Sequence, residues 1–143
     1  MFHRVLVAID GSEHSYAALR RALEVLKLTP LTQVAIIEVV PPVDPSIEYL
    51  PWVSPAQLEE AEKKRAQADL DRALAILKDA GIEGKPLIKI GNPAEEIVAT
   101  AKEGNYELIV MGRRGTNPLK ELLLGGVSQR VLHLTECPVF LGK

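Results

Sequence analysis

The 143-residue sequence is poor in several kinds of residue, and each scarcity excludes a class of protein. It has a single cysteine, Cys137, which excludes a disulfide framework and a thiolate metal cage. Its formal net charge of −2 gives no sign of a polyanionic partner such as nucleic acid. Its longest apolar runs fall far short of the roughly 20 residues that cross a bilayer, so no membrane segment is predicted.

The remaining composition is typical of one folded domain. Apolar residues make up 47% of the chain and charged residues 25%, as in ordinary globular proteins rather than disordered ones. The length fits a single domain over residues 1–143. The first residues lead directly into a strand pattern without a separate signal segment, which favours a cytoplasmic location.

Apolar runs alternate with segments of helical period along the whole chain. The runs expected as buried strands are Val5–Ile9, Val34–Val40, Leu87–Ile90, Leu108–Met111 and Val139–Leu141. Helices are expected to begin at Ser12, Ser54 and Asn92, and a fourth to span Pro118–Leu134 with a glycine interruption. This order predicts an α/β fold with a single doubly wound, five-stranded, mainly parallel sheet and helices on both faces.

The longest expected helix follows a capping box, Ser54–Gln57. Its charged residues from Glu59 to Arg65 have helical spacing and fit a solvated face. The histidines His3, His14 and His133 are widely separated, so the sequence predicts no zinc site.

Glycines cluster after the fourth expected strand. Gly112 and Gly115 follow that strand directly, and Gly125–Ser128 come one helical stretch later. Glycines let main-chain N–H groups approach an anion, and a helix that begins near Gly126 adds unpaired amides and a positive dipole end. Together these segments predict a phosphate site, with glycines that serve only as turns as the alternative. Neither a Walker phosphate loop nor a Rossmann G-x-G-x-x-G motif accompanies them.

At these residues the chain resembles the universal stress protein family over nearly its whole length. The segments that carry the resemblance are Val5–Asp10, Gly91–Ile97, Leu108–Gly112, Leu119–Leu124 and Cys137–Val139. The nucleotide-binding branch of the family has the pattern G-x₂-G-x₉-G-[ST], and Gly112, Gly115 and Gly125 fall at its spacings. Gly126 stands where the pattern has a hydroxyl residue. This departure removes one side-chain contact to phosphate but leaves the Gly126 amide and the Ser128 hydroxyl.

The resemblance implies a site for an adenine nucleotide, ATP or AMP with Mg²⁺ as an optional companion, between the first and fourth strands. The residues that it assigns to the site are Ala8, Ile9, Asp10, Val39, Met111, Gly112, Gly115, Gly125, Gly126, Val127 and Ser128. Within this set Val39 would pack against adenine, Met111 would flank the base and Asp10 would contact the ribose.

Some polar positions near the expected site allow more than one role. Asp10 suits ribose recognition at a strand end, but it can also cap the helix that starts at Ser12. Arg113 and Arg114 can pair with a triphosphate, or they can lie exposed in a loop. Glu38 stands where the family often has histidine, and its simplest interpretation is a polar residue at the rim of the site.

The resemblance further implies a cytoplasmic stress-response protein that binds nucleotide as a regulatory or protective module. Since no general base or activated nucleophile is recognised, at most slow hydrolysis is expected. The alternative is a nucleotide-independent homodimeric interaction module, which Gly126 favours, whereas an ATP-consuming ligase or transferase would need a second domain. The last strand, Val139–Leu141, would be an apolar edge, and the resemblance implies that it pairs with the same strand of a second copy.

Overall fold

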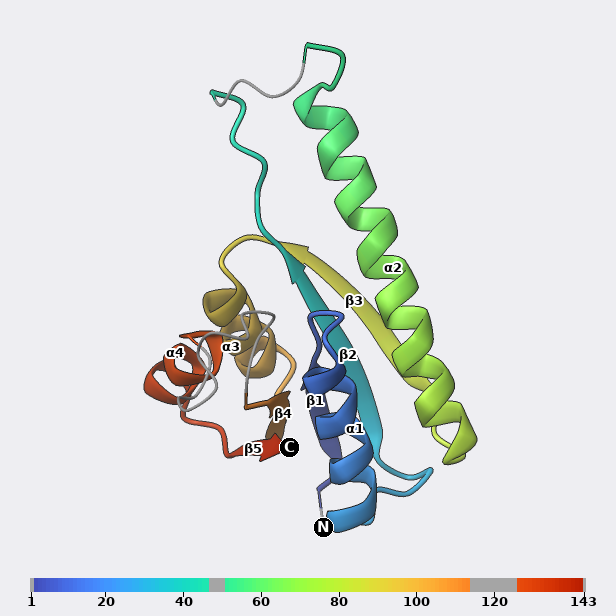
Figure 1. Cartoon of the computed structure of the whole chain (residues 1–143). Helices are drawn as coiled ribbons and strands as arrows, with labels where there is room; N and C mark the ends of the chain where they lie inside the picture. The colour runs from blue at the N-terminus through green and yellow to red at the C-terminus, as the bar shows by residue number, and fades with distance from the viewer. Residues whose placement is uncertain (1, 47–50, 114–125, 143) are drawn as a thin grey trace.

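The computed structural model, which describes residues 2–46, 51–113 and 126–142, contains one parallel sheet with the strand order β3-β2-β1-β4-β5 (Figure 1). The strands are β1 (Arg4–Ala8), β2 (Gln33–Val40), β3 (Gly84–Ile90), β4 (Leu108–Gly112) and β5 (Val139–Gly142). All neighbouring strands in this sheet are parallel. The predicted doubly wound α/β fold is therefore confirmed.

Helices cover both faces of the sheet (Figure 1). They are α1 (Glu13–Val25), α2 (Pro55–Asp79), α3 (Pro93–Glu103) and α4 (Gly126–Leu134). α1 and α2 pack on one face, and α3 and α4 pack on the other. None of the helices in the described ranges is long and apolar enough to cross a membrane.

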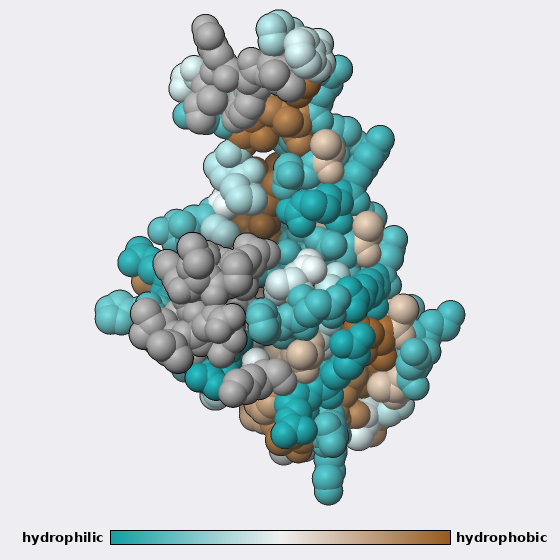
Figure 2. All heavy atoms as spheres, in the orientation of Figure 1, coloured by the Kyte–Doolittle hydropathy of each residue, from teal (hydrophilic) through white to brown (hydrophobic). Residues whose placement is uncertain are grey.

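The first half of α2 and the described residues directly before it, 51–54, rise beyond the end of the sheet (Figure 1). Figure 2 shows hydrophobic side chains gathered in this projecting part, while hydrophilic side chains cover much of the remaining visible face. The second half of α2 packs against β2 and β3 through Leu70, Ala73 and Leu77, which are fully buried. α2 is therefore fixed to the sheet by its second half.

The apolar run in β1 places the sheet at the centre of two cores. Val5 and Val7 point into the core shared with α1 and α2, and Leu6 and Ala8 point into the core shared with α3 and α4. Successive side chains of a strand alternate between faces, so a continuous apolar run is stable only where both faces are covered. Full burial of each such side chain stabilises the fold by roughly 1.5–3 kcal/mol.

Short polar motifs begin the helices where the sequence predicts them. The Ser12 and Ser54 hydroxyls each accept a hydrogen bond from the backbone N–H three residues ahead, and the side chain of Asn92 does the same for α3. At Ser54 the Gln57 side chain accepts from the Ser54 N–H, which completes the predicted capping box.

β3 begins at Gly84, earlier than predicted, because the start of this strand carries no apolar pattern. Pro86 is tolerated in it because β3 is an edge strand. α4, Gly126–Leu134, lies within the helix predicted over Pro118–Leu134. Residues 118–125 lie outside the described part of the chain.

We expect Gly142→Ala to destabilise the protein by about 1–3 kcal/mol, as overpacking does in other cores. A Cβ at Gly142 would lie 2.5 Å from the Ala18 Cα of α1, so the two backbones would have to separate. Urea unfolding would measure the change in free energy. The matched control is Gly126→Ala, whose Cβ would meet nothing within 4 Å in the part of the chain that the structure describes. Equal stability of the two variants would contradict this close packing.

Candidate functional site

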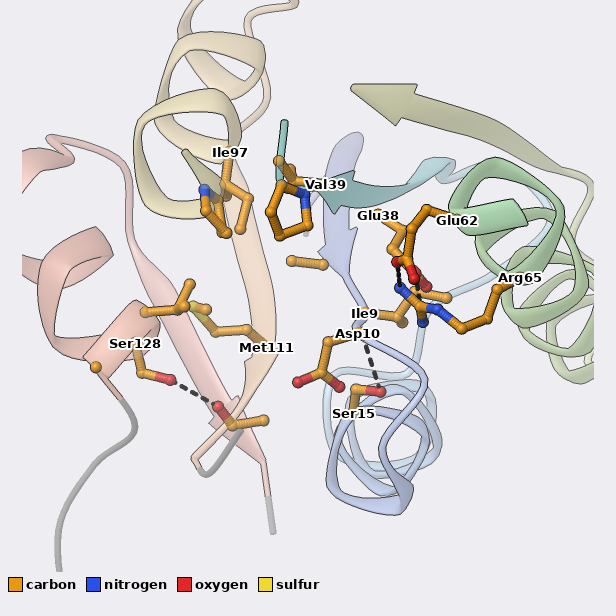
Figure 3. Close-up of a pocket in the computed structure, with 16 residues that line it drawn as sticks. Ile9, Asp10, Ser15, Glu38, Val39, Glu62, Arg65, Ile97, Met111 and Ser128 are labelled. Atoms are coloured by element: carbon orange, nitrogen blue, oxygen red, sulfur yellow. Dashed lines mark hydrogen bonds and ion pairs between the residues drawn. The ribbon is translucent and has the colours of Figure 1, made fainter. Parts of the chain in front are cut away.

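A pocket of about 490 Å³ lies beyond the carboxyl ends of β1, β2 and β4 (Figure 3). β1 is flanked by β2 on one side and by β4 on the other, so the strand order reverses beside it. Crevices that bind ligands in open parallel sheets form at such a reversal. The strand order therefore explains the place of the pocket.

Every predicted site residue within the described ranges lines this pocket. These residues are Ala8, Ile9, Asp10, Val39, Met111, Gly112, Gly126, Val127 and Ser128. Gly115, Gly125 and Arg114 lie outside the described residues, and Arg113 is exposed. Glu38, which the sequence placed at the rim of the site, also lines the pocket. The lining residues that the sequence did not predict are Ser15, Pro41, Glu62, Arg65, Pro93 and Ile97.

One wall of the pocket is apolar. Val39 at the end of β2, Ile97 of α3 and Met111 of β4 face the same space in Figure 3, and Pro93 at the start of α3 adjoins them. Ile97 and Met111 are almost fully buried, so packing fixes their positions. A flat apolar group such as a nucleobase would lose water-exposed surface against this wall.

The opposite end of the pocket is built from glycine backbone. Gly112 ends β4 close to the start of α1, where a Cβ would lie 3.0 Å from the His14 carbonyl oxygen. Gly126 is the first described residue of α4 and lines the pocket. The amides of a helix's first turn have no partner within the helix. The Ser128 hydroxyl donates to the Gly112 carbonyl oxygen at 2.8 Å. This hydrogen bond links α4 to β4, so the Ser128 hydroxyl proton is not available to a ligand.

Asp10 lies in the turn before α1 but is not the cap of that helix. Its Oδ1 accepts a hydrogen bond of 2.9 Å from the Ser12 N–H, but Ser12 itself is the N-cap of α1. The turn between them needs glycine, since Gly11 has a φ of +82°. In Figure 3 the Asp10 carboxylate faces the side of the pocket where Met111 and Ser128 lie. Asp10 thus shapes the turn and also lines the pocket.

The wall toward α2 holds a cluster of charges that the sequence analysis did not predict. Arg65 donates a hydrogen bond of 3.3 Å to Glu38 and forms ion pairs with Glu62 at 2.8 Å and with Asp69 at 3.0 Å. Arg65 and Glu62 are partly exposed, as a solvated face implies, but they also line the pocket, which the sequence did not predict. Glu38 is 1% exposed, so its expected place at the rim was wrong.

Burial perturbs the acidity of this cluster. Desolvation, followed by a hydrogen bond and charge repulsion from Asp69, raises the pKa of Glu38 from 4.5 to about 8. Burial also raises the pKa of Tyr16, whose hydroxyl donates to the Asp69 carbonyl oxygen at 3.0 Å, to about 12. The Glu38 carboxyl is therefore largely neutral near pH 7.

The family model for the universal stress protein family matches residues 1–143. The chain belongs to this family. A universal stress protein of Bacillus subtilis, YxiE, is 34% identical over 147 residues, and the alignment covers 99% of each chain. The family assignment therefore extends over the whole described fold and over each segment that carried the resemblance.

Solved universal stress proteins share the architecture. The structure of hypothetical protein MJ0577 from Methanocaldococcus jannaschii has a TM-score of 0.84 and 28% identity, and it matches 100% of this chain and 96% of its own. A universal stress protein from Archaeoglobus fulgidus, solved in complex with dAMP, has a TM-score of 0.66 and 22% identity and matches 100% of this chain and 98% of its own. At 22% identity that likeness concerns the fold alone.

The raised pKa of Glu38 predicts how stability depends on pH. The folded protein keeps a proton on Glu38 that the unfolded chain releases above about pH 4.5, so the free energy of unfolding falls from there to about pH 8. Below 4.5 both states are protonated, and above 8 both are ionised, so this contribution is constant there. We expect Glu38→Gln, which imitates the neutral acid, to lack this decline.

Urea unfolding of both proteins across this range would measure the difference. Glu62→Gln is the matched control, because Glu62 pairs with the same Arg65 but its side chain is 42% exposed. A decline of equal steepness in the Glu38→Gln protein would contradict a neutral buried Glu38.

Proposed function

We propose that this universal stress protein binds an adenine nucleotide, ATP or AMP, in the pocket between β1 and β4. The observation that carries the proposal is the meeting of an apolar wall and a glycine backbone end within one pocket of about 490 Å³. Small-molecule sites have typical volumes of roughly 300–1,000 Å³ and combine apolar walls with a few polar groups. The pocket therefore suits a base at Val39 and Met111 and a phosphate at Gly112 and Gly126.

The charges of the pocket favour this orientation of the nucleotide. Arg65 is paired with carboxylates on the α2 side, so it offers little charge to a phosphate. The start of α4 lies away from that cluster and presents amides and the positive end of a helix dipole. Asp10 lies between the two ends and would accept hydrogen bonds from ribose hydroxyls.

The dAMP complex of the Archaeoglobus fulgidus protein supports the proposal at the level of the fold, because that fold accommodates an adenine nucleotide. Mg²⁺ enters the proposal only as a companion of ATP, since Mg²⁺ in nucleotide sites is held largely through phosphate oxygens. In this proposal the protein acts in the cytoplasm as a nucleotide-dependent stress-response module with at most slow hydrolysis.

Calorimetric titration with AMP and ATP tests the proposal, together with mass spectrometry of nucleotide released from the purified protein. A few charged hydrogen bonds, each worth roughly 1.5–3 kcal/mol, and burial of the base predict dissociation constants in the micromolar range, about −8 kcal/mol. UMP is the control, because its smaller base covers less of the apolar wall. Absence of adenine nucleotide binding at millimolar ligand would exclude this function.

Gly126 offers a sharper test of where the phosphate lies. We expect Gly126→Ser to tighten nucleotide binding about tenfold, because it restores a hydroxyl that can donate to a charged group. Among the residues that the structure describes, the Cβ of the new side chain meets nothing within 4 Å. Gly126→Ala, which adds the Cβ without the hydroxyl, should not tighten binding. Equal affinities of the two variants, measured by calorimetry, would place the phosphate elsewhere.

We also propose a homodimer through β5, an edge strand of the sheet. The Pro138 carbonyl oxygen accepts from Ile109 of β4, and that of Gly142 accepts from Arg113, directly after β4. The backbone groups of Val139 and Leu141 therefore point away from the sheet. Val139→Pro removes one outward N–H without breaking the β4 ladder and should give a monomer by light scattering. Phe140→Pro breaks the ladder and should unfold β5 instead. A folded, dimeric Val139→Pro protein would contradict pairing through this edge.

The second candidate function is a nucleotide-independent homodimeric interaction module, which the missing hydroxyl at Gly126 favours. Val39→Trp separates the two functions, because the larger side chain would fill the base end of the pocket. Unchanged stress survival and partner binding in this variant would support the second function. Loss of survival with an intact dimer would support the nucleotide-dependent one.

A further inference from the structure

Glu38 and Asp69 bind the same nitrogen of Arg65. Arg65 Nη1 donates to Glu38 Oε2 at 3.3 Å and to Asp69 Oδ2 at 3.0 Å. Two carboxylates on one nitrogen must lie close together, and like charges at such distances repel strongly when both are ionised. The arrangement therefore favours a state with fewer than two negative charges.

The second carboxyl oxygen of Glu38 indicates that Glu38, and not Asp69, carries the proton. Glu38 Oε1 is buried and has no hydrogen-bond donor among the residues that the structure describes. A buried acceptor without a donor costs roughly 1–3 kcal/mol, and more when it is charged. A proton on Glu38 removes this cost, because the carboxyl can then donate to the carboxylate of Asp69, which lies within hydrogen-bonding reach.

The elements packed around Glu38 and Asp69 each contribute a charged or polar group. The β1–α1 turn brings Asp10, and Gly11 in that turn leaves room for Asp69, whose Oδ2 would lie 2.6 Å from a Cβ at this position. α1 brings Tyr16, whose hydroxyl binds the Asp69 carbonyl oxygen. α2 brings Arg65 and Glu62.

The next turn of α2 adds a cation that is already engaged. The Arg72 guanidinium lies 4.0 Å from the centre of the Tyr16 ring and is paired with Glu13 of α1 at 2.9 Å. Carboxylates thus outnumber free cations around the pair, which further favours the protonated state.

We propose that Glu38 and Asp69 share one proton at neutral pH, and that loss of this proton adds a negative charge to the pocket wall and so makes nucleotide affinity depend on pH. In this role Glu38 acts on the ligand through its own charge, because Glu38 itself lines the pocket. The proposal rests on the proposed function for its ligand, but the shared proton itself is a property of the protein without nucleotide.

Loss of the proton adds one negative charge to a wall that already carries Asp10 and Glu62. Across a partly exposed pocket, one added charge changes the affinity for a doubly charged phosphate by about three- to tenfold. The second ionisation of the phosphate is complete near pH 7, since its pKa is about 6, so it does not mask the effect above that pH. The pKa of Glu38 is about 8, so the change in nucleotide affinity is expected above pH 7 as well.

The first experiment follows the carboxyl carbons of the nucleotide-free protein by NMR as the pH rises. We expect Glu38 to titrate near pH 8 and Asp69→Asn to move this midpoint downward, because the variant removes the partner charge. Glu62→Gln, which removes another Arg65 partner but leaves the pair intact, should move the midpoint much less. A Glu38 midpoint near 4.5 in the unmodified protein would overturn the shared proton, whether or not any variant folds.

The second experiment measures AMP binding by calorimetry from about pH 7 to about pH 9. We expect the affinity of the unmodified protein to fall about three- to tenfold, and that of Glu38→Gln to stay constant, because its amide imitates the protonated acid. Affinity that is independent of pH, with Glu38 titrating near 8, would overturn the coupling to the pocket. If AMP does not bind at all, the proposed function and the coupling fall together, and the titration still decides whether the proton is shared.

Discussion

Burial of β1 on both faces is the constraint on which the rest of the structure depends. β1 pairs with β2 and β4, and its side chains from Val5 to Ala8 join two cores on opposite faces of the sheet. α1 follows β1 on one face of the sheet, whereas α4 follows β4 on the other face. The connections that leave these two neighbouring strands therefore separate at the carboxyl ends. The crevice that forms there becomes the pocket, and Asp10, in the turn that follows β1, lies in it.

The three kinds of surface in the pocket follow from the elements that surround that crevice. The apolar wall comes from β2, β4 and α3, whose side chains there belong to the core on the α3 and α4 face of the sheet. The glycine end arises where β4 stops against α1 and where α4 starts. The charged wall comes from α2, whose long first half stands over the end of β2 (Figure 1). A ligand in this pocket meets three chemically different walls, which explains why an amphipathic molecule such as a nucleotide suits it.

The sequence predicts the parts of the molecule that depend on local pattern. The apolar run of β1, the capping box at Ser54 and the Asn92 cap each act within a few residues, and each is observed. The sequence does not predict the start of β3. Gly84 is required there because a Cβ would lie 2.5 Å from the Leu77 side chain, and not because of a strand pattern. Such a long-range steric constraint leaves no periodic signal in the sequence.

The charged wall was missed for the same reason. Glu38 looks like an isolated polar residue in an apolar strand, and Arg65 looks like one of many charges on a helix. Only the packing of α2 on β2 brings them within 3.3 Å, across 27 positions of the chain. A charged residue within an otherwise buried strand was the available signal, because such a residue needs a partner from another element. The Gly126 substitution, in contrast, was visible in the sequence because the motif spacing defines it.

The central claim is that one pocket, at the ends of β1, β2 and β4, receives an adenine nucleotide with its phosphate at the glycine end. Amide chemical shifts of ¹⁵N-labelled protein during titration with AMP test this claim most directly. The account predicts shifts that saturate together at Asp10, Gly112, Gly126 and Val127, which line the pocket from three different elements. Unchanged amides at these four residues with millimolar AMP, or shifts confined to the far side of the sheet, would contradict it.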